Sequence, residues 1–466
     1  MTTPIQPNDV IAKAEALRND LSSGFRDEIV KSLYNEAEKI ARRAVKATGE
    51  KKYDFDQKID RLVTSPFTGL PIMLILLGTI IWLTVQGANV PSQLIAKGLF
   101  AIGNWASALF TSWNVPWWIT GFIWDGVYRG LAWVIAVMLP PMAIFFPAFT
   151  ILEDLGYLPR VAFNLDWLFK KAGAHGKQSL TMAMGFGCNA AGVIATRVID
   201  SPRERLIAIL TNNFVPCNGR FPTLIMLATV FVAASFSPAL TSFIAAGTVV
   251  GVVLIGIGFT FFMSWLLSKT VLKGEASAFT LELPPYRRPN IMRILYTSII
   301  DRTIFVLWRA MQTAAPAGAV IWVLANIPFG STNLAGAIAG WLNPVGVLLG
   351  LDGVILLAYI IAIPANEIVV PTMMMMYMGV GMMVDAPSSS EAIRSLLVGV
   401  HGWTLLTAIN LMLFSLLHNP CGTTIMTIYK ETKSYKWAAL SVVITLGTAF
   451  LVTFLTASLA RLIGWV

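Results

Sequence analysis

The chain has 466 residues, of which 56% are hydrophobic and only 13% are charged. Soluble domains carry about 25% charged residues, so this composition excludes an ordinary soluble globular protein and indicates a membrane protein. The formal net charge is +9, and most of the basic surplus lies in short segments beside apolar stretches. That distribution is typical of the positive-inside rule, so we expect membrane lipids, and no nucleic acid, among the partners.

Residues 1–65 differ from the rest because they mix acidic and basic residues evenly. Apolar residues recur there at helical spacing, which predicts a cytoplasmic amphipathic helix or helical pair on the membrane surface. The segment lacks the short apolar core of a signal peptide. We therefore expect a cytoplasmic N-terminus and a first span that inserts the chain by itself.

Apolar stretches that can cross a hydrocarbon core of about 30 Å, which takes about 20 residues, recur from residue 68 onward. The expected full spans are 68–86, 127–152, 204–232, 238–268, 304–326, 398–428 and 437–463. Four basic loops are expected on the cytoplasmic side, 153–178, 197–205, 269–309 and 430–436, and three segments nearly free of Lys and Arg on the outer side, 86–124, 233–240 and 326–352. Residues 92–122 suit either a further hairpin or an interfacial helix anchored by tryptophans.

Four apolar segments are interrupted by proline or glycine beside a polar residue. They are "GFGCNAAG" from residue 185, "NNFVPCNGRFP" from 212, "IPANEIVVP" from 363 and "LHNPCGTT" from 417. We expect 178–197 and 353–383 to be re-entrant or interrupted helices, which are tolerated at membrane depth only where the backbone is buried in protein or lines a cavity. In the first break, glycines would let the helix open.

Each half of the chain thus has one broken re-entrant segment followed by one broken span, the signature of a transporter with its site where broken helices meet. The expected fold is an all-α polytopic membrane protein with two inverted structural repeats. Its parts would be the N-terminal segment 1–65, a first transmembrane repeat 66–272, a cytoplasmic linker 273–303 and a second transmembrane repeat 304–466.

Two isolated charges lie within these apolar stretches. Glu367 is the only charged residue in 353–384, and Arg220 the only one in 206–268. A lone charge at the centre of a membrane helix costs about 2.5–3.5 kcal/mol, so it usually faces a partner, water or substrate. We interpret Glu367 as a cation ligand and Arg220 as an organiser of its own loop; the alternative is that the two form a pair.

The chain has only three cysteines, and each lies at a break beside an asparagine. A free cysteine in an apolar segment is ordinarily a small buried hydrophobe, but this placement favours a ligand role. Thiolate, carboxylate and amide oxygen together suit a borderline divalent transition metal. The predicted metal site consists of Cys188, Asn189, Cys217, Asn218, Asn366, Glu367 and Cys421; no catalytic residue and no cofactor-binding residue is predicted.

Other candidate motifs favour plainer interpretations. The methionine run 373–376 points around a helix in all directions, which favours packing over a soft-metal stripe. The three histidines are scattered, and only His418, near the fourth break, is worth testing as a ligand. The segment "KAGAHGKQS" from residue 171 fails the phosphate-loop pattern at both ends, and "GFGCNAAG" lacks the third glycine of a dinucleotide fingerprint. The chain is therefore not expected to be a nucleotide-hydrolysing enzyme.

At these residues the chain resembles the transmembrane part of the ferrous iron transport protein B family. The resemblance covers roughly residues 55–466 and rests on seven stretches. They are "DQKIDRLVTSPFTGLPI", "LEDLGYLPRVAFNLDWLFKKAGAHGKQS", "GFGCNAAGVIATRVIDSPRERL" (the first gate motif), "PCNGRFPTL", "LELPPYRRPN", "IPANEIVVPT" (the second gate motif) and "NPCGTTIMTIYKETKSYKWA". Two departures stand out: the family usually has proline near the position of Ala191 and lysine at the position of Asn366.

The resemblance implies ferrous iron uptake across the inner (plasma) membrane of a prokaryote, with cysteines touching the metal. It also implies a cytoplasmic G-protein domain ahead of the first span, for which the 65 residues here leave no room. Either a separate G-protein binds here or transport runs without one; we expect the separate G-protein, docked on the N-terminal helix within residues 1–65 and on the loops at 153–178 and 269–303. A small cytoplasmic accessory protein and a homo-oligomer are further partners left open. The alternatives in substrate are manganese or another divalent metal, or a nucleoside or other organic solute; a membrane scaffold for a G-protein is the alternative in class.

Overall fold

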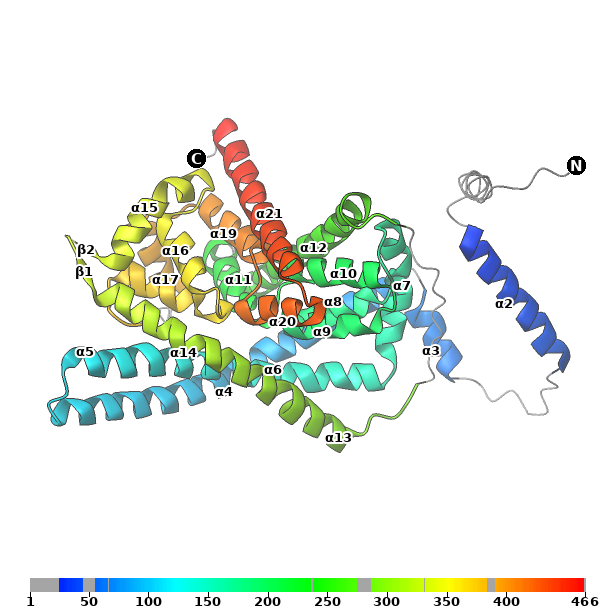
Figure 1. Ribbon diagram of the computed structural model, residues 1–466, viewed down its shortest axis with the longest axis horizontal. Coiled ribbons are helices and arrows are strands. Elements are labelled where there is room, and N and C mark those ends of the chain that lie inside the picture. The colour runs from blue at the N-terminus through cyan, green and yellow to red at the C-terminus, as the bar shows by residue number, and fades with distance from the viewer. Residues whose placement is uncertain are drawn as a thin grey trace, which may run out of the picture.

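The computed structural model describes residues 25–44, 55–65, 67–235, 238–274, 286–330, 332–383 and 390–464. Almost all of these residues are helical (Figure 1). Six helical segments among them are long and apolar enough to cross a membrane, namely 69–112, 117–154, 202–232, 244–269, 405–432 and 435–462. The prediction of an all-α polytopic membrane protein is therefore confirmed.

The N-terminal segment contains two described helices, α2 (Phe25–Ala44) and α3 (Phe55–Val63). The α2 side chains described from Ser32 onward are all exposed, and the helix lies apart from the rest of the chain in Figure 1. In contrast, Val63 of α3 packs with Tyr157 and Val161. The expected helical pair is thus present, although residues 1–24 and 45–54 of that segment lie outside the described residues.

The next elements form a long helical hairpin. Helix α4 (Gly69–Ser112) is followed by α5 (Trp117–Thr120), the π-helix η1 (Gly121–Tyr128) and α6 (Arg129–Asp154). In Figure 1, α4 and α5 lie side by side and extend to the left end of the molecule. Residues 92–112 are the second part of α4, and residues 117–122 begin the returning segment, so 92–122 form the tip of this one hairpin and not the further hairpin that was one of the two possibilities.

The expected bounds of the first span, 68–86, are wrong because α4 continues through Pro91 without a break. A helix of 44 residues is about 66 Å long at 1.5 Å per residue, about twice the hydrocarbon thickness. The predicted boundary failed because proline inside a membrane helix does not have to end it.

The remainder of the first half contains the first two breaks. Its elements are α7 (Tyr157–Lys171), α8 (Gln178–Gly187), α9 (Asn189–Ala195), η2 (Thr196–Val198), α10 (Pro202–Thr211), η3 (Asn212–Phe214), η4 (Asn218–Arg220), α11 (Phe221–Leu227), η5 (Ala228–Val232), η6 (Ala233–Ser235) and α12 (Pro238–Lys269). Helix α10 starts with Ser201, whose hydroxyl accepts a hydrogen bond from the Glu204 amide, and with proline at the first turn. The predicted basic loop 153–178 is wrong in form, because most of it is helix α7.

The second half repeats this order of breaks. Its elements are α13 (Ile291–Tyr296), η7 (Thr297–Ile304), α14 (Phe305–Asn326), the strands β1 (Pro328–Phe329) and β2 (Thr332–Asn333), α15 (Leu334–Leu348), α16 (Gly353–Ile361), η8 (Asn366–Ile368), α17 (Val369–Met378), α18 (Ser390–Arg394), η9 (Ser395–Val400), α19 (Leu405–Leu417), α20 (Gly422–Thr432) and α21 (Tyr435–Leu462). The strands are antiparallel, with Pro328 opposite Asn333.

Three expectations for the second half need correction. The predicted basic loop 269–309 contains α13 and η7 in its described part, and the predicted span 398–428 begins only at Leu405. Helix α15 lies within 326–352 and bends by 110° into α16, so this segment adds a turn at the membrane that the sequence did not predict. The boundary carries local signals, since Gly350 has a positive φ and Asp352 caps α16, but our prediction assigned 326–352 to the outer side from its lack of Lys and Arg alone.

The basic and the charge-poor segments lie at opposite ends of the molecule. In Figure 1, α3 and α7 lie to the right, whereas α5, β1, β2 and α15 lie to the left. This separation agrees with the expected grouping of 153–178 on one side and of 86–124 and 326–352 on the other. We call the end that carries α3, α7 and residues 286–293 the basic face.

Candidate functional site

Each of the four predicted breaks interrupts a helix in the structure. Cys188 has an extended backbone (φ −156°, ψ 124°) between α8 and α9, and Ala365 (φ −153°, ψ 115°) has the same conformation just before η8. Cys217 immediately precedes η4, and Cys421 immediately precedes α20. The three cysteines therefore occupy equivalent positions, each at the residue before a helix or turn begins.

The four breaks enclose one small cavity of about 30 Å³. All seven predicted site residues line it: Cys188, Asn189, Cys217, Asn218, Asn366, Glu367 and Cys421. These residues come from segments up to 233 positions apart, between Cys188 and Cys421. The expectation that the four breaks would converge on a shared space is confirmed; their role as metal ligands stays a prediction.

Glu367 lies against the second break. A Cβ atom placed on Gly219 would come within 2.6 Å of the Glu367 carboxyl carbon, so the two segments touch at a point that only glycine allows. The Glu367 backbone oxygen accepts a hydrogen bond from the Trp133 indole at 3.4 Å. Its carboxylate forms no ion pair with any residue in the described ranges, and the neighbouring Asn366 amide nitrogen is buried without a hydrogen-bond partner.

Arg220 is 1% exposed, and its hydrogen-bond partners are backbone carbonyl groups. Its guanidinium donates to the carbonyl oxygens of Leu416 (2.7 Å), His418 (2.9 Å), Asn213 (3.1 Å) and Asn419 (3.4 Å). It thus satisfies carbonyls left free at the end of α19 as well as one in its own loop. The alternative of a Glu367–Arg220 pair is wrong, and the organising role reaches further than its own loop because it joins the second and fourth breaks.

The glycines of the first break permit close packing. A Cβ atom on Gly185 would lie 2.9 Å from the Asn212 side-chain oxygen, and one on Gly192 would lie 2.8 Å from the same oxygen. None of the glycines in this break has a positive φ, although α8 does end at Gly187, directly before the extended Cys188; that the glycines let the helix open stays a prediction. Gly185 and Gly192 admit Asn212, whose amide donates to the Asn189 carbonyl at 3.2 Å.

The third and fourth breaks are joined by a backbone hydrogen bond. The Gly422 amide donates to the Ile363 carbonyl at 2.7 Å, which holds Cys421 beside Asn366 and Glu367 on the cavity wall. The Cys421 sulfur lies 3.4 Å from the Thr424 hydroxyl oxygen. The second-half side of the cavity is therefore fixed by main-chain geometry.

Sequence reasoning missed several lining residues. Met138 and Met142 on α6 contribute thioethers, and Thr423 contributes a hydroxyl group two residues after Cys421. The signal that could have found the methionines is the Pro140–Pro141 pair between them, since proline within an apolar span also marks the other breaks, although α6 continues through this pair. His418 does not line the cavity; it stacks on Phe414, with ring centroids 5.8 Å apart. The run Met373–Met375 is buried in the core, as the packing interpretation predicted.

Among the described residues, no three His, Cys, Asp or Glu side chains are arranged to hold one metal ion together. The donors that do line the cavity are thiol, thioether, amide and one carboxylate. Such a mixed set can accept a borderline divalent cation without closing around it. A wall of donors that does not form a tight ligand shell suits passage better than storage.

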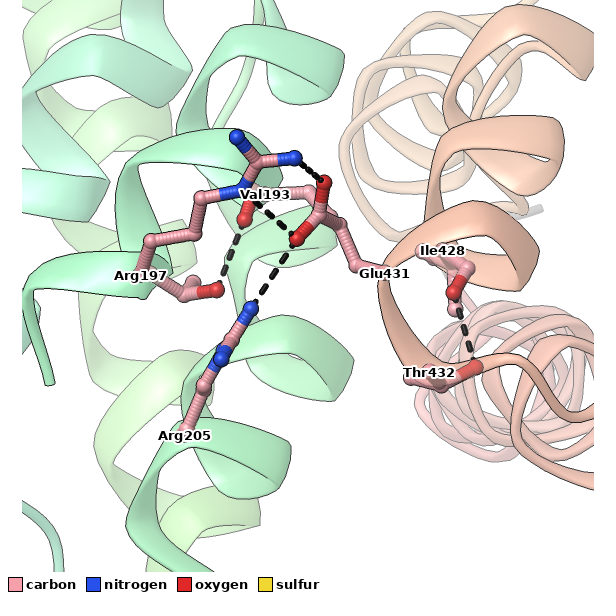
Figure 2. Close-up of polar contacts among 7 residues, drawn as sticks. Val193, Arg197, Arg205, Ile428, Glu431 and Thr432 are labelled. Atoms are coloured by element: carbon pink, nitrogen blue, oxygen red, sulfur yellow. Dashed lines mark hydrogen bonds and ion pairs between the residues drawn. The ribbon is translucent and has the colours of Figure 1, made fainter. Parts of the chain in front are cut away.

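An ion-pair cluster links the two halves beside the first and fourth breaks (Figure 2). Glu431 on α20, with its side chain 6% exposed, accepts from Arg197 (2.6 and 2.9 Å) and from Arg205 (3.0 Å). Beneath it, Val193 of α9 and Ile428 of α20 belong to one apolar cluster. We call Glu431, Arg197 and Arg205 the latch, because it fastens α20 to α10 and to the turn after α9.

At the basic face, Arg160 is 1% exposed and bonded on several sides. It pairs with Asp60 at 3.0 Å, donates to the Gly156 carbonyl at 2.6 Å and lies 4.0 Å from the Tyr286 ring centroid. Burial would raise the pKa of Asp60, but the hydrogen bonds from Arg160 and Tyr286 together with the charge of Arg160 outweigh this and lower it below its usual value. The cluster ties α3 and Tyr286 to α7.

Two family descriptions match parts of the chain. Residues 135–231 match the Gate family, described as nucleoside recognition, and residues 249–301 match the family described as the ferrous iron transport protein B C terminus. No solved structure matches the chain. The Fe(2+) transporter FeoB of Staphylococcus aureus (strain MSSA476) is 30% identical over 482 residues, which cover 98% of this chain and 67% of that relative.

The chain belongs to the Fe(2+) transporter FeoB family. The FeoB of Synechocystis sp. (strain ATCC 27184 / PCC 6803 / Kazusa) is 30% identical over 421 residues, covering 87% of this chain and 63% of the relative. A relative described as an Fe(2+) transport protein A/Fe(2+) transporter FeoB fusion protein, from Porphyromonas gingivalis (strain ATCC BAA-308 / W83), is 27% identical over 496 residues and is covered to 55%. This FeoB-family chain thus spans about two thirds or less of these relatives, which range from 55% to 67% coverage.

Proposed function

We propose that this FeoB-family chain carries ferrous iron across a cell membrane toward the cytoplasm, through the cavity between the four breaks. The single observation that carries this proposal is the convergence of all seven predicted donors on one cavity of about 30 Å³. The names of the relatives, which are Fe(2+) transporters, agree with this cargo. Thiol and carboxylate donors together favour a borderline transition metal over magnesium or calcium.

The size of the cavity distinguishes a metal ion from an organic solute. A space of about 30 Å³ holds one or two water molecules, whereas pockets for small organic ligands have about 300–1,000 Å³. A nucleoside carrier would need the breaks to separate widely. Manganese is the closer competitor, since it shares the charge of ferrous iron but prefers oxygen ligands over thiolate.

We further propose that a G-protein supplied as another chain acts at the basic face and that the membrane is the inner membrane of a prokaryote. The exposed residues of α2 carry the alternating charges Glu36, Glu38, Lys39 and Arg42, which suit a polar protein partner. The N-terminus would then lie in the cytoplasm, as the basic segments on the same side favour.

Anaerobic uptake into proteoliposomes tests the proposal. Purified chain would be offered ferrous iron, manganese or a nucleoside, with and without a candidate G-protein and GTP. We expect iron uptake to exceed that of the other two, and to be stimulated by the G-protein with GTP. Background uptake of iron in every combination would overturn the transport proposal, and equal uptake of a nucleoside would move the function to organic solutes.

The cysteines are tested by the variants Cys188→Ser and Cys217→Ser, with Cys421→Ser as the third position. Serine keeps the size and removes the soft ligand, so iron uptake should fall by about tenfold or more while manganese uptake changes less. Val443→Ser on the exposed face of α21 is the matched control, because it makes a polar change far from the cavity. An equal loss for both metals in the cysteine variants would indicate packing rather than ligation.

A further inference from the structure

A larger space adjoins the four-break cavity. It has a volume of about 500 Å³ and shares two wall residues, Val306 of α14 and Thr423 of α20, with the cavity. Its other walls include Ala191, Ile194 and Ala195, all on the helix that follows Cys188. We call this space the vestibule. Because Val306 and Thr423 line both spaces, the site and the vestibule adjoin at these two residues.

The vestibule leads to the basic face. Its far end is lined by Glu153 and Pro159, and both residues also line a third space of about 380 Å³ that contains Arg287, Arg288 and Arg293. Glu153 is exposed and lies at the end of α6, one residue before the helix stops at Asp154. Three adjoining spaces therefore run from the four breaks to the basic face.

We propose that the vestibule is the route by which the ion leaves the four-break cavity toward the basic face, with Glu153 as the acidic group at its mouth. This inference rests on the proposed function. By the positive-inside rule, the basic face is expected to be cytoplasmic, so the route sets the direction of uptake.

The lining of the vestibule suits release rather than binding. Its walls are mostly apolar, including Phe146, Leu180 and Ile194, and its charged residues are one acid, Glu153, and one base, Arg309. Opposite charges in one space leave little net attraction for a divalent cation. An ion that has left the thiols and Glu367 would therefore be held only weakly until it reaches solvent.

The direction is tested without any transport measurement by Ala195→Cys. A membrane-impermeant maleimide should label the introduced thiol in inside-out vesicles and not in intact cells, with the unsubstituted chain giving the background from the three native cysteines. Labelling from the opposite face, or no labelling above background from either face, would overturn the route.

The path itself is tested by filling it with Ala195→Trp. We expect iron uptake to fall by tenfold or more while anaerobic equilibrium dialysis still detects iron binding to the protein. Val443→Trp adds the same bulk on the exposed face of α21 and should leave uptake unchanged. Should the tryptophan variant misfold, labelling of Ala195→Cys with the maleimide should block uptake instead.

Glu153→Gln tests the mouth of the route. It leaves Arg309 as the only charged vestibule residue, so we expect uptake to slow by about threefold with unchanged equilibrium binding. If all vestibule changes leave uptake intact while Cys188→Ser abolishes it, the ion travels by another path and the transport function stands. If the unsubstituted chain transports no iron, the proposed function fails, and the route falls with it.

Discussion

Two buried arginines and the glutamate on the cavity wall differ in how their charges are compensated. Arg160 at the basic face has a carboxylate, a carbonyl and an aromatic ring around its guanidinium, and Arg220 donates to four carbonyls between the breaks. Glu367, by contrast, lines a cavity and forms no ion pair with a described residue. The two arginines hold segments together, whereas the glutamate faces an opening.

The difference separates structural charges from the charge available to a substrate. A buried charge is costly unless partners compensate it, and the protein provides those partners for both arginines. Glu367 has this cost without such partners. The interaction that offsets the cost must therefore come from an occupant of the cavity. Substituting each kind of charge should therefore change different properties: stability for the arginines and transport for the glutamate.

The largest effect is expected for Arg220→Met. This change leaves buried carbonyls at the end of α19 and in the second break without their donor, so stability should fall by about 3 kcal/mol. Arg220→Lys keeps the charge, but the lysine ammonium cannot donate to several carbonyls at once as the planar guanidinium does. Its loss of stability should therefore be smaller than that of Arg220→Met. Thermal unfolding in detergent measures both. Equal stability of Arg220→Met and the unsubstituted chain would show that Arg220 does not hold the breaks together.

The next effect is expected for Glu367→Gln, and it should appear in transport. The glutamine has nearly the same shape but no charge to offer a cation, so iron uptake should fall by about tenfold or more, which corresponds to about 1.4 kcal/mol. Stability should be unchanged or higher, because an uncompensated charge at membrane depth is removed. Uptake assays and thermal unfolding on the same preparation give both values.

The opposite pattern would break the comparison. If Glu367→Gln unfolds at a lower temperature and transports normally, the glutamate is a structural charge like the two arginines. Glu36→Gln is the matched control because Glu36 is exposed on α2, where its side chain pairs with the exposed Lys39 three residues away. It should change neither the unfolding temperature nor uptake.

The latch lies between these extremes, because its acid is buried and its bases are partly exposed. The Glu431 side chain is 6% exposed, compared with 65% for Arg197 and 33% for Arg205. Glu431→Gln should lower stability by about 1–2 kcal/mol, since it removes the charge that two arginines share. Arg197→Gln should cost less than Arg205→Gln because Arg197 is the more exposed. The reverse order in thermal unfolding would contradict this account.

The sequence predicted the site better than it predicted the surrounding helices. Proline, glycine and a polar residue inside an apolar run are local signals, and they located Cys188, Cys217, Glu367 and Cys421 at real breaks. We expected these breaks to converge because each half of the chain has a broken re-entrant segment followed by a broken span, and transporter sites lie where such helices meet. Helix α15 was missed because its segment was assigned to the outer side from its lack of Lys and Arg, and the full length of α4 was missed because the helix continues through Pro91 and the polar residues around it.

Pairs that are distant in the sequence could not be predicted. Asp60 and Arg160 are 100 residues apart, and Arg197 and Glu431 are 234 apart, so no spacing rule connects them. The partners of the Arg220 side chain could not be predicted either, since a lone arginine in the sequence gives no indication that its partners will be carbonyls. These contacts depend on how the two halves pack against each other.

The smallest effect is expected for Asp60→Asn, which removes the carboxylate partner of the buried Arg160. The Asp60 side chain is 29% exposed, so its pair with Arg160 should contribute only about 0.5–1 kcal/mol after solvent screening. Because Arg160 lowers the folded-state pKa of Asp60 below the unfolded value of about 3.9, this contribution is present above that pH and is lost as the pH falls through the folded-state pKa. Unfolding curves of the two chains should therefore differ at pH 7 and converge in acid. A difference that persists after the pH has fallen well below the folded-state pKa of Asp60 would mean that the aspartate stabilises α3 by something other than its charge.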